Sequence, residues 1–241
     1  MTSQSTEKAE VKNHPTTDGS LPEFVDWLVA AGIVLGGLIS LVGGSALFFL
    51  VDRDLLSEGI EGGTVTVTLV QTELTDAEML EVVLAVVSWT GIGLLVTGLG
   101  MILFAIGYVI RRRRTHRRVR NGETANSYWA NVVLGAVATA VLSFIPFSPG
   151  IGGAIAGYLE RGESDRTVSV GALSGVFSML PLLVIVVAAL GGLVSGMLAI
   201  DQAGVAIVVG MGLLFVLMLM ATVGAGLGAL GGYVGGRFAE R

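Results

Sequence analysis

The sequence predicts an all-α fold, a polytopic integral membrane bundle of about six transmembrane helices (five to seven) packed through glycine-rich faces. First, 53% of the 241 residues are hydrophobic and only 14% are charged, against about 25% in ordinary soluble domains. Second, no Asp, Glu, Lys or Arg occurs in five stretches of 25 to 36 residues, and apolar runs of 18 or more are typical of transmembrane helices. Third, glycine supplies 36 residues, about twice its usual share. A soluble globular enzyme is therefore excluded.

The charge-free stretches give the domain organisation. Residues 1–22 are polar, lack hydrophobic periodicity, and are predicted to form a disordered cytoplasmic tail. Residues 23–120 are predicted to form a two-helix transmembrane module, and residues 121–241 a glycine-rich four-helix transmembrane module. The five stretches are Trp27–Val51, Val82–Ile110, Thr124–Leu159, Thr167–Ile200 and Gln202–Gly236.

An arginine cluster at residues 111–120 predicts the orientation. By the positive-inside rule this segment is cytoplasmic, whereas the outer loop 52–81 has eight acidic residues and one basic residue. The chain is therefore predicted to lie in the cell membrane with both termini cytoplasmic. The arginines are also candidate contacts for anionic lipid headgroups; the alternative is that they only fix the topology. They are Arg111, Arg112, Arg113, Arg114, Arg117, Arg118 and Arg120.

The outer loop contains two local signals. Residues Thr64–Leu69 alternate between threonine and an apolar residue, which predicts a strand. Thr75 and Glu78 have the spacing of a capping box, so the second long helix is predicted to begin at Asp76.

The third charge-free stretch is too long for a single crossing and contains two prolines. Pro146 and Pro149 predict a break at residues 146–150, because proline cannot continue a helix and restricts the residue before it. The stretch is predicted to be a hairpin, with Ser127–Ile145 as a full span and a short leg over residues 150–161. The short leg either crosses the membrane or is a re-entrant half-helix.

Small residues recur at every fourth position in several stretches, which lets helix backbones approach closely in lipid. These faces either pack within one chain or form a seam between copies, and the last stretch is the best candidate for such a seam. The residues are Gly32, Gly36, Ser40 and Gly44 in the first stretch, Gly153 and Gly157 in the hairpin, and Gly224, Gly228, Gly232 and Gly236 in the last.

The hairpin also resembles the last stretch. A shift of 75 residues superimposes Asn131–Leu159 on Ala206–Val234 with eight identities, among them Gly153 on Gly228 and Gly157 on Gly232. The match suggests an internal duplication.

A polar stripe precedes and enters the broken hairpin. Asn131, Thr139 and Ser143 follow helical spacing, and Ser148 lies in the break. Broken helices beside polar side chains are where transporters hold substrates, so these four residues are candidates for a pore or substrate site. The alternative is a set of hydrogen bonds between packed helices.

Several residue types are missing from the predicted spans. There is no cysteine and only two histidines, His14 and His116, so neither a thiolate site nor a metal site is expected. Asp26, at the edge of the first span, is the one ionisable residue there, which argues against a proton-coupled transporter. No catalytic residues, cofactor or nucleic-acid partner are predicted.

The C-terminal half contains a set of mainly small residues and prolines: Asn131, Pro146, Ser148-Pro149, Gly152-Gly153-Ala154, Ala156–Leu159, Gly171–Gly175 and Leu180-Pro181. With these residues it resembles an uncharacterised family of haloarchaeal multi-pass membrane proteins over Trp129–Arg241. The resemblance implies the membrane class but no activity. A high ratio of arginine to lysine, an acidic balance and the lack of cysteine also suggest a salt-loving archaeon.

Two functions follow as hypotheses. The first is a non-enzymatic structural or accessory membrane component that packs or oligomerises through its small-residue faces, with membrane lipids and another copy or an unidentified membrane protein as partners. The second is a passive pore or small-solute permease whose path runs near residues 146–150.

Overall fold

The computed structural model describes residues 23–62, 74–121, 128–160 and 164–240, and all regular structure within these ranges is helical. The predicted tail 1–22 and the predicted strand at residues 64–69 lie outside the described residues. The helices are α1 (Glu23–Leu50), α2 (Arg53–Glu61), α3 (Asp76–Arg120), α4 (Tyr128–Val141), α5 (Ser148–Glu160), α6 (Ser164–Ala199) and α7 (Ala203–Ala239).

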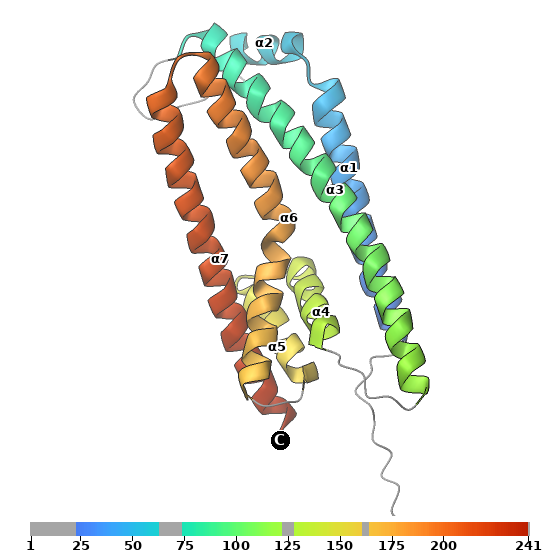
Figure 1. Ribbon diagram of the computed structural model, residues 1–241. Helices are drawn as coiled ribbons and strands as arrows, with labels where there is room; N and C mark the ends of the chain where they lie inside the picture. The colour runs from blue at the N-terminus through green and yellow to red at the C-terminus, as the bar shows by residue number, and fades with distance from the viewer. Residues whose placement is uncertain (1–22, 63–73, 122–127, 161–163, 241) are drawn as a thin grey trace, which may run out of the picture.

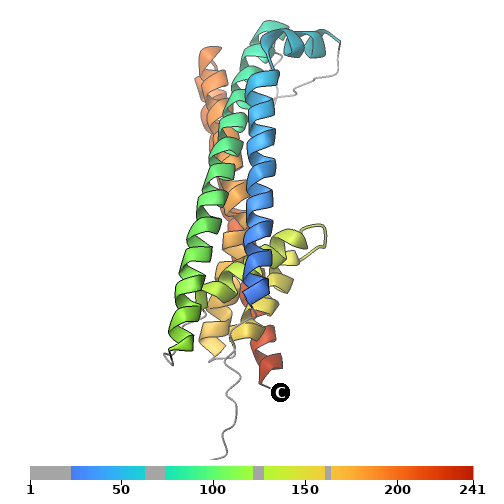
Figure 2. The same cartoon turned by 90° about the vertical axis from the view of Figure 1, so that its right-hand side faces the viewer.

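Four of these helices, α1, α3, α6 and α7, are long and apolar enough to cross a membrane. They run side by side along one axis (Figures 1 and 2). At a rise of about 1.5 Å per residue their lengths are roughly 42 to 68 Å, more than a hydrocarbon core of about 30 Å. The all-α membrane bundle is confirmed, while the expected count of about six crossings is not.

The long helices form two pairs. α1 packs on α3, α6 packs on α7, and contacts between α3 and α6 join the pairs. α2 and the α6–α7 turn lie at one end of the bundle, and the C-terminus lies at the other (Figure 1). The arginines of residues 111–120 also lie at this second end, which we call the arginine-bearing end.

The α4–α5 hairpin differs from its prediction. Ser127–Ile145 was expected to be a full span, which is wrong: α4 ends at Val141, and residues 142–147 turn the chain. Pro146 lies within this turn and disfavours helical backbone at the residue before it, and Phe147 reverses the backbone with a φ of 66°. With 14 and 13 residues, α4 and α5 are each about 20 Å long.

Both legs of this hairpin lie in the half of the bundle nearer the arginine-bearing end, and its turn lies about midway along the long helices (Figure 1). The legs are too short for a hydrocarbon core of about 30 Å. The hairpin thus has the geometry of a re-entrant pair of half-helices. The chain returns to the arginine-bearing end whether the hairpin crosses or re-enters, so the C-terminus lies there in either case.

The segment between α1 and α3 contains a helix that the sequence analysis did not predict. Asp52 caps α2 by accepting a hydrogen bond from the Leu55 amide at 2.9 Å. Leu56 and Ile60 face the start of α3, where they pack on Leu80. In the sequence, this helix is indicated by an N-cap aspartate followed by two apolar residues four positions apart.

The capping box at the start of α3 is confirmed. The Thr75 amide donates to Glu78 Oε2 at 2.9 Å, and the Glu78 amide contacts Thr75 Oγ1 at 3.4 Å. α3 accordingly begins at Asp76, as predicted.

Glycines hold α1 against α3, but only in part those of the predicted face. A Cβ added at Gly44 would lie 2.8 Å from the Gly91 carbonyl oxygen, and one added at Gly37 would lie 2.9 Å from that of Gly98. A Cβ added at Gly32 would have no neighbouring atom within 4 Å, and one added at Gly36 would contact only the end of the Met101 side chain. The contact repeats every seven residues, as in left-handed packing of neighbouring helices.

Candidate functional site

The arginine-bearing end of the α1–α3 pair contains a buried polar cluster around Asp26. Its Oδ2 accepts a hydrogen bond from Arg112 Nε at 2.6 Å and lies 2.8 Å from His116 Nε2. Its Oδ1 accepts a hydrogen bond from the Tyr108 hydroxyl at 2.9 Å. Asp26 and Arg112 are only 6% and 7% exposed.

The spacing along α3 explains this cluster. Tyr108, Arg112 and His116 are four residues apart, so their side chains lie on one helix face. α1 presents Asp26 to that face, and Val29 and Ile33 extend the contact as an apolar cluster deeper along the helix pair. The two carboxylate oxygens are thus occupied by three donors from α3, which ties the two helices together.

The arginine cluster is divided among different environments. Arg112 is buried against Asp26, so its side chain is not presented to lipid headgroups. Arg113 stacks over Trp27 at 5.5 Å from the ring centroid. Arg111, Arg114, Arg117 and Arg118 are exposed, and the side chain of Arg120 lies outside the described residues.

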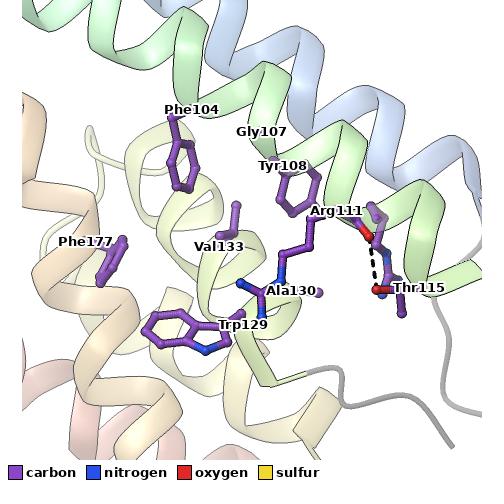
Figure 3. A pocket seen from close by; sticks show the side chains of 10 residues that line it. Phe104, Gly107, Tyr108, Arg111, Thr115, Trp129, Ala130, Val133 and Phe177 are labelled. Carbon is purple, nitrogen blue, oxygen red and sulfur yellow. Dashed lines mark hydrogen bonds between the residues drawn. The ribbon is translucent and has the colours of Figure 1, made fainter.

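A cleft of about 300 Å³ lies next to the Asp26 cluster, between α3, α4 and α6. Arg111 extends from α3 into this cleft towards Trp129 of α4 (Figure 3). Phe104 of α3 and Phe177 of α6 form facing apolar walls (Figure 3). The cleft also includes Gly107, Tyr108, Arg112, Thr115, Ala130 and Val133. The sequence analysis missed it, because its lining comes from three segments that only the fold brings together.

A second polar group closes the base of the hairpin. Asn131 Nδ2 donates to Glu160 Oε2 at 2.9 Å, and Glu160 Oε1 pairs with Arg166 at 2.9 Å. The Glu160 side chain is 5% exposed. Tyr128 adds a hydrogen bond from its hydroxyl to Ser169 at 3.0 Å. These contacts connect the start of α4, the end of α5 and the start of α6.

The structure separates the four residues of the predicted polar stripe. Asn131 and Thr139 are buried, and the Thr139 hydroxyl donates to the Gly135 carbonyl at 2.9 Å. Ser148 is buried at the start of α5, whereas Ser143 is exposed in the hairpin turn. Three of the four side chains therefore face protein, and only Ser143 faces outward.

The glycines of the hairpin and of α7 lie against one another within the chain. A Cβ added at Gly153 would overlap the carbonyl oxygen of Gly228, and one added at Gly157 would overlap that of Gly232. The same two residues of α7 also contact Gly171 of α6. The pairs that the internal repeat superimposes are thus in direct contact.

The rest of the predicted α7 seam also lies within the chain. Gly224 lies against Met179 of α6, and Gly236 lies against Thr167. The face of Gly224, Gly228, Gly232 and Gly236 is therefore covered by the hairpin and α6 rather than open to a second copy.

The hairpin turn carries two strongly exposed phenylalanine residues. Phe144 and Phe147 are 79% and 71% exposed. Within the described chain, the backbone amides of these two residues donate to no other group, whereas those of Ser143 and Ile145 donate to the Ala140 and Leu142 carbonyls.

Residues 129–238 match a family of unknown function (DUF5518). No curated protein and no solved structure is significantly similar to the chain. The expected resemblance of the C-terminal half to a family of unknown function is confirmed, and a haloarchaeal origin stays a prediction. The match assigns no activity.

Proposed function

We propose that this membrane protein is a non-enzymatic structural or accessory component of a membrane protein assembly. The arginine-bearing end would face the cytoplasm with both termini, because arginines and lysines accumulate in cytoplasmic segments. α2, in the acidic loop 52–81, would face outside.

The observation that carries this proposal is the exposed hairpin turn. Its polar backbone lies about midway along the long helices (Figure 1), and the amides of Phe144 and Phe147 find no partner among the described residues. Irregular backbone at membrane depth is tolerated only where protein covers it or where it lines a water-filled cavity. We infer that a neighbouring protein covers this turn.

The buried polar groups support a structural role. Asp26 is occupied by three donors of α3, and Glu160 is shared between Asn131 and Arg166. Each group bridges two or more helices, and buried pairs of this kind fix the register of packed elements. Their hydrogen bonds to neighbouring helices support a role in helix packing rather than in substrate binding.

Cross-linking at the turn tests the assembly. The chain has no cysteine, so Ser143→Cys provides a single thiol at the turn. Oxidation in native membranes is expected to join this thiol to a second copy, or an amine- and thiol-reactive linker to join it to another protein. Leu182→Cys, 57% exposed on α6, is the matched control for random collisions. Equal cross-linking of both variants, or none, would count against the proposal.

A passive pore or small-solute permease is the second candidate, favoured by the outward-facing Ser143 in a broken hairpin. Here the turn would meet water rather than protein. A membrane-impermeant maleimide is then expected to label Ser143→Cys but not Leu182→Cys, and bulky labelling should block solute flux in proteoliposomes. Absence of labelling would reject the pore.

A further inference from the structure

The cleft between α3, α4 and α6 combines a cation with apolar walls. Arg111 lies on one side, and the apolar lining includes Phe104, Val133 and Phe177. Phe104 and Trp129 are 44% and 45% exposed, so the cleft is open at the surface of the bundle. Its volume of about 300 Å³ suits part of a lipid molecule, such as a phosphate group and the first segment of a chain.

Arg111 differs from its neighbours in the arginine cluster. Arg112 pairs with Asp26 and Arg113 stacks on Trp27. In the described part of the chain, the Arg111 guanidinium has no acidic partner and extends into the cleft (Figure 3). A guanidinium in this position can form two parallel hydrogen bonds to a phosphate.

The polarity of the cleft follows the membrane axis. Phe104 precedes Arg111 by seven residues, so it lies on the same face of α3 about 10 Å deeper in the bundle. Phe104 and Phe177 belong to charge-free stretches, whereas Arg111 begins the arginine cluster. Trp129 lies beside the Arg111 guanidinium (Figure 3), and tryptophan is enriched at the interfaces of membrane proteins.

We propose that this cleft binds an anionic membrane phospholipid, with the lipid phosphate on Arg111 and an acyl chain between Phe104 and Phe177. A soluble phosphate compound would satisfy Arg111 but leave the aromatic walls uncovered. An uncharged lipid would cover the walls without neutralising the guanidinium. A zwitterionic phospholipid would place its phosphate on Arg111, but its cationic headgroup would find no acidic side chain in the cleft lining. The inference does not depend on the assembly proposed above, because the whole cleft lies within one chain.

Quenching of tryptophan fluorescence by brominated lipids tests this site. Trp129 lines the cleft, and Trp27→Phe with Trp89→Phe makes it the sole tryptophan of the chain. This variant is reconstituted with mixtures of phosphatidylglycerol and phosphatidylcholine in which one of the two lipids is brominated on its acyl chains. The relative affinity of the cleft for the two lipids is then read from the quenching.

We expect phosphatidylglycerol to be preferred by at least about fivefold, the effect of one arginine near a membrane surface. Arg111→Gln should reduce this preference to near unity. Arg114→Gln, which removes an exposed arginine that does not line the cleft, should reduce it far less than Arg111→Gln does. Both variants keep six of the seven arginines that orient the helix, so each serves as the insertion control for the other.

Three results would overturn the proposal. Equal quenching by the two lipids would show that the cleft does not select charge. An equal loss in Arg111→Gln and Arg114→Gln would assign the preference to the whole cluster rather than to the cleft. Displacement of the brominated lipid by soluble glycerol phosphate would identify a free anion, not a lipid, as the ligand.

Discussion

Asp26 and Arg112 are 86 positions apart in the sequence, yet Arg112 Nε lies 2.6 Å from Asp26 Oδ2 in a nearly buried ion pair. The pair joins α1 to α3 at the arginine-bearing end. Burial removes both charges from water, which costs free energy. This desolvation cost is offset only while the two charges are paired and Tyr108 and His116 also contact the carboxylate.

We predict that removing either member of this pair destabilises the protein. Asp26→Leu and Arg112→Met should each lower the free energy of unfolding by about 3 to 5 kcal/mol, because each leaves an uncompensated buried charge. The double variant should recover only part of this loss, because Tyr108 and His116 still lose the Asp26 carboxylate. Unfolding in mixed micelles, followed by circular dichroism, measures the cycle.

Arg53 and Glu81 provide the matched surface pair. Their side chains are 58% and 42% exposed at a distance of 2.9 Å, so Arg53→Gln should cost less than about 1 kcal/mol. A loss in Asp26→Leu no larger than this would contradict a structural role for the buried pair.

The second prediction concerns the contact between α5 and α7. Gly153→Ala should lower the free energy of unfolding by about 1 to 3 kcal/mol, because its Cβ would overlap the Gly228 carbonyl oxygen. Gly226→Ala is the control on α7, where an added Cβ meets nothing within 4 Å, and it should be neutral or stabilising by up to about 1 kcal/mol. Thermal denaturation of the purified protein compares the two; equal melting temperatures would show that the contact is looser than described.

The third prediction concerns the turn between α6 and α7. Asp201 has a φ of 57° and ends α6 in a Schellman motif, in which the Gln202 amide donates to the Met197 carbonyl at 2.9 Å and the Asp201 amide to that of Leu198 at 3.2 Å. Asp201→Gly should keep or raise stability, since glycine adopts this conformation without strain. Asp201→Val should cost about 1 to 2 kcal/mol. A higher melting temperature for the valine variant would contradict this geometry.

The fourth prediction separates packing from permeation at the hairpin base. Asn131→Leu should lower stability by about 1 to 3 kcal/mol, because Glu160 loses a buried donor. Asn131→Asp should lower it further by placing a second carboxyl group beside Glu160. Ser143→Ala, at the exposed turn, should leave the melting temperature unchanged. If Asn131→Leu abolished solute flux while the stability stayed unchanged, the result would support the pore hypothesis instead.

The local features of the fold were predictable from the sequence. The capping box at Thr75 and Glu78 depends on residues three positions apart, and the hairpin break depends on Pro146 and Pro149. The length of the hairpin legs was less predictable: α4 ends at Val141, although residues 142–145 are apolar except for Ser143. Hydropathy counts apolar residues and does not register where a helix stops within lipid.

The partners of equivalent residues were not predictable. Arg111 and Arg112 are adjacent and identical, but a helix turns by about 100° per residue. Arg112 therefore meets Asp26, while Arg111 enters the cleft. Gly37 and Gly98 form a helix contact that the four-residue pattern did not identify. Which face of a helix meets a neighbour depends on where that neighbour lies.

The sequence by itself determined that this is a helical membrane protein, where its long apolar segments lie, and where its caps and its proline break occur. These properties follow from hydrophobicity and from interactions between residues a few positions apart. Only the tertiary structure decided that the small residues of α7 face α5 and α6, that Asp26 has partners on α3, and that a cationic cleft forms between three helices. Such contacts arise from side chains that are distant in sequence, and their free energy depends on the arrangement of whole helices.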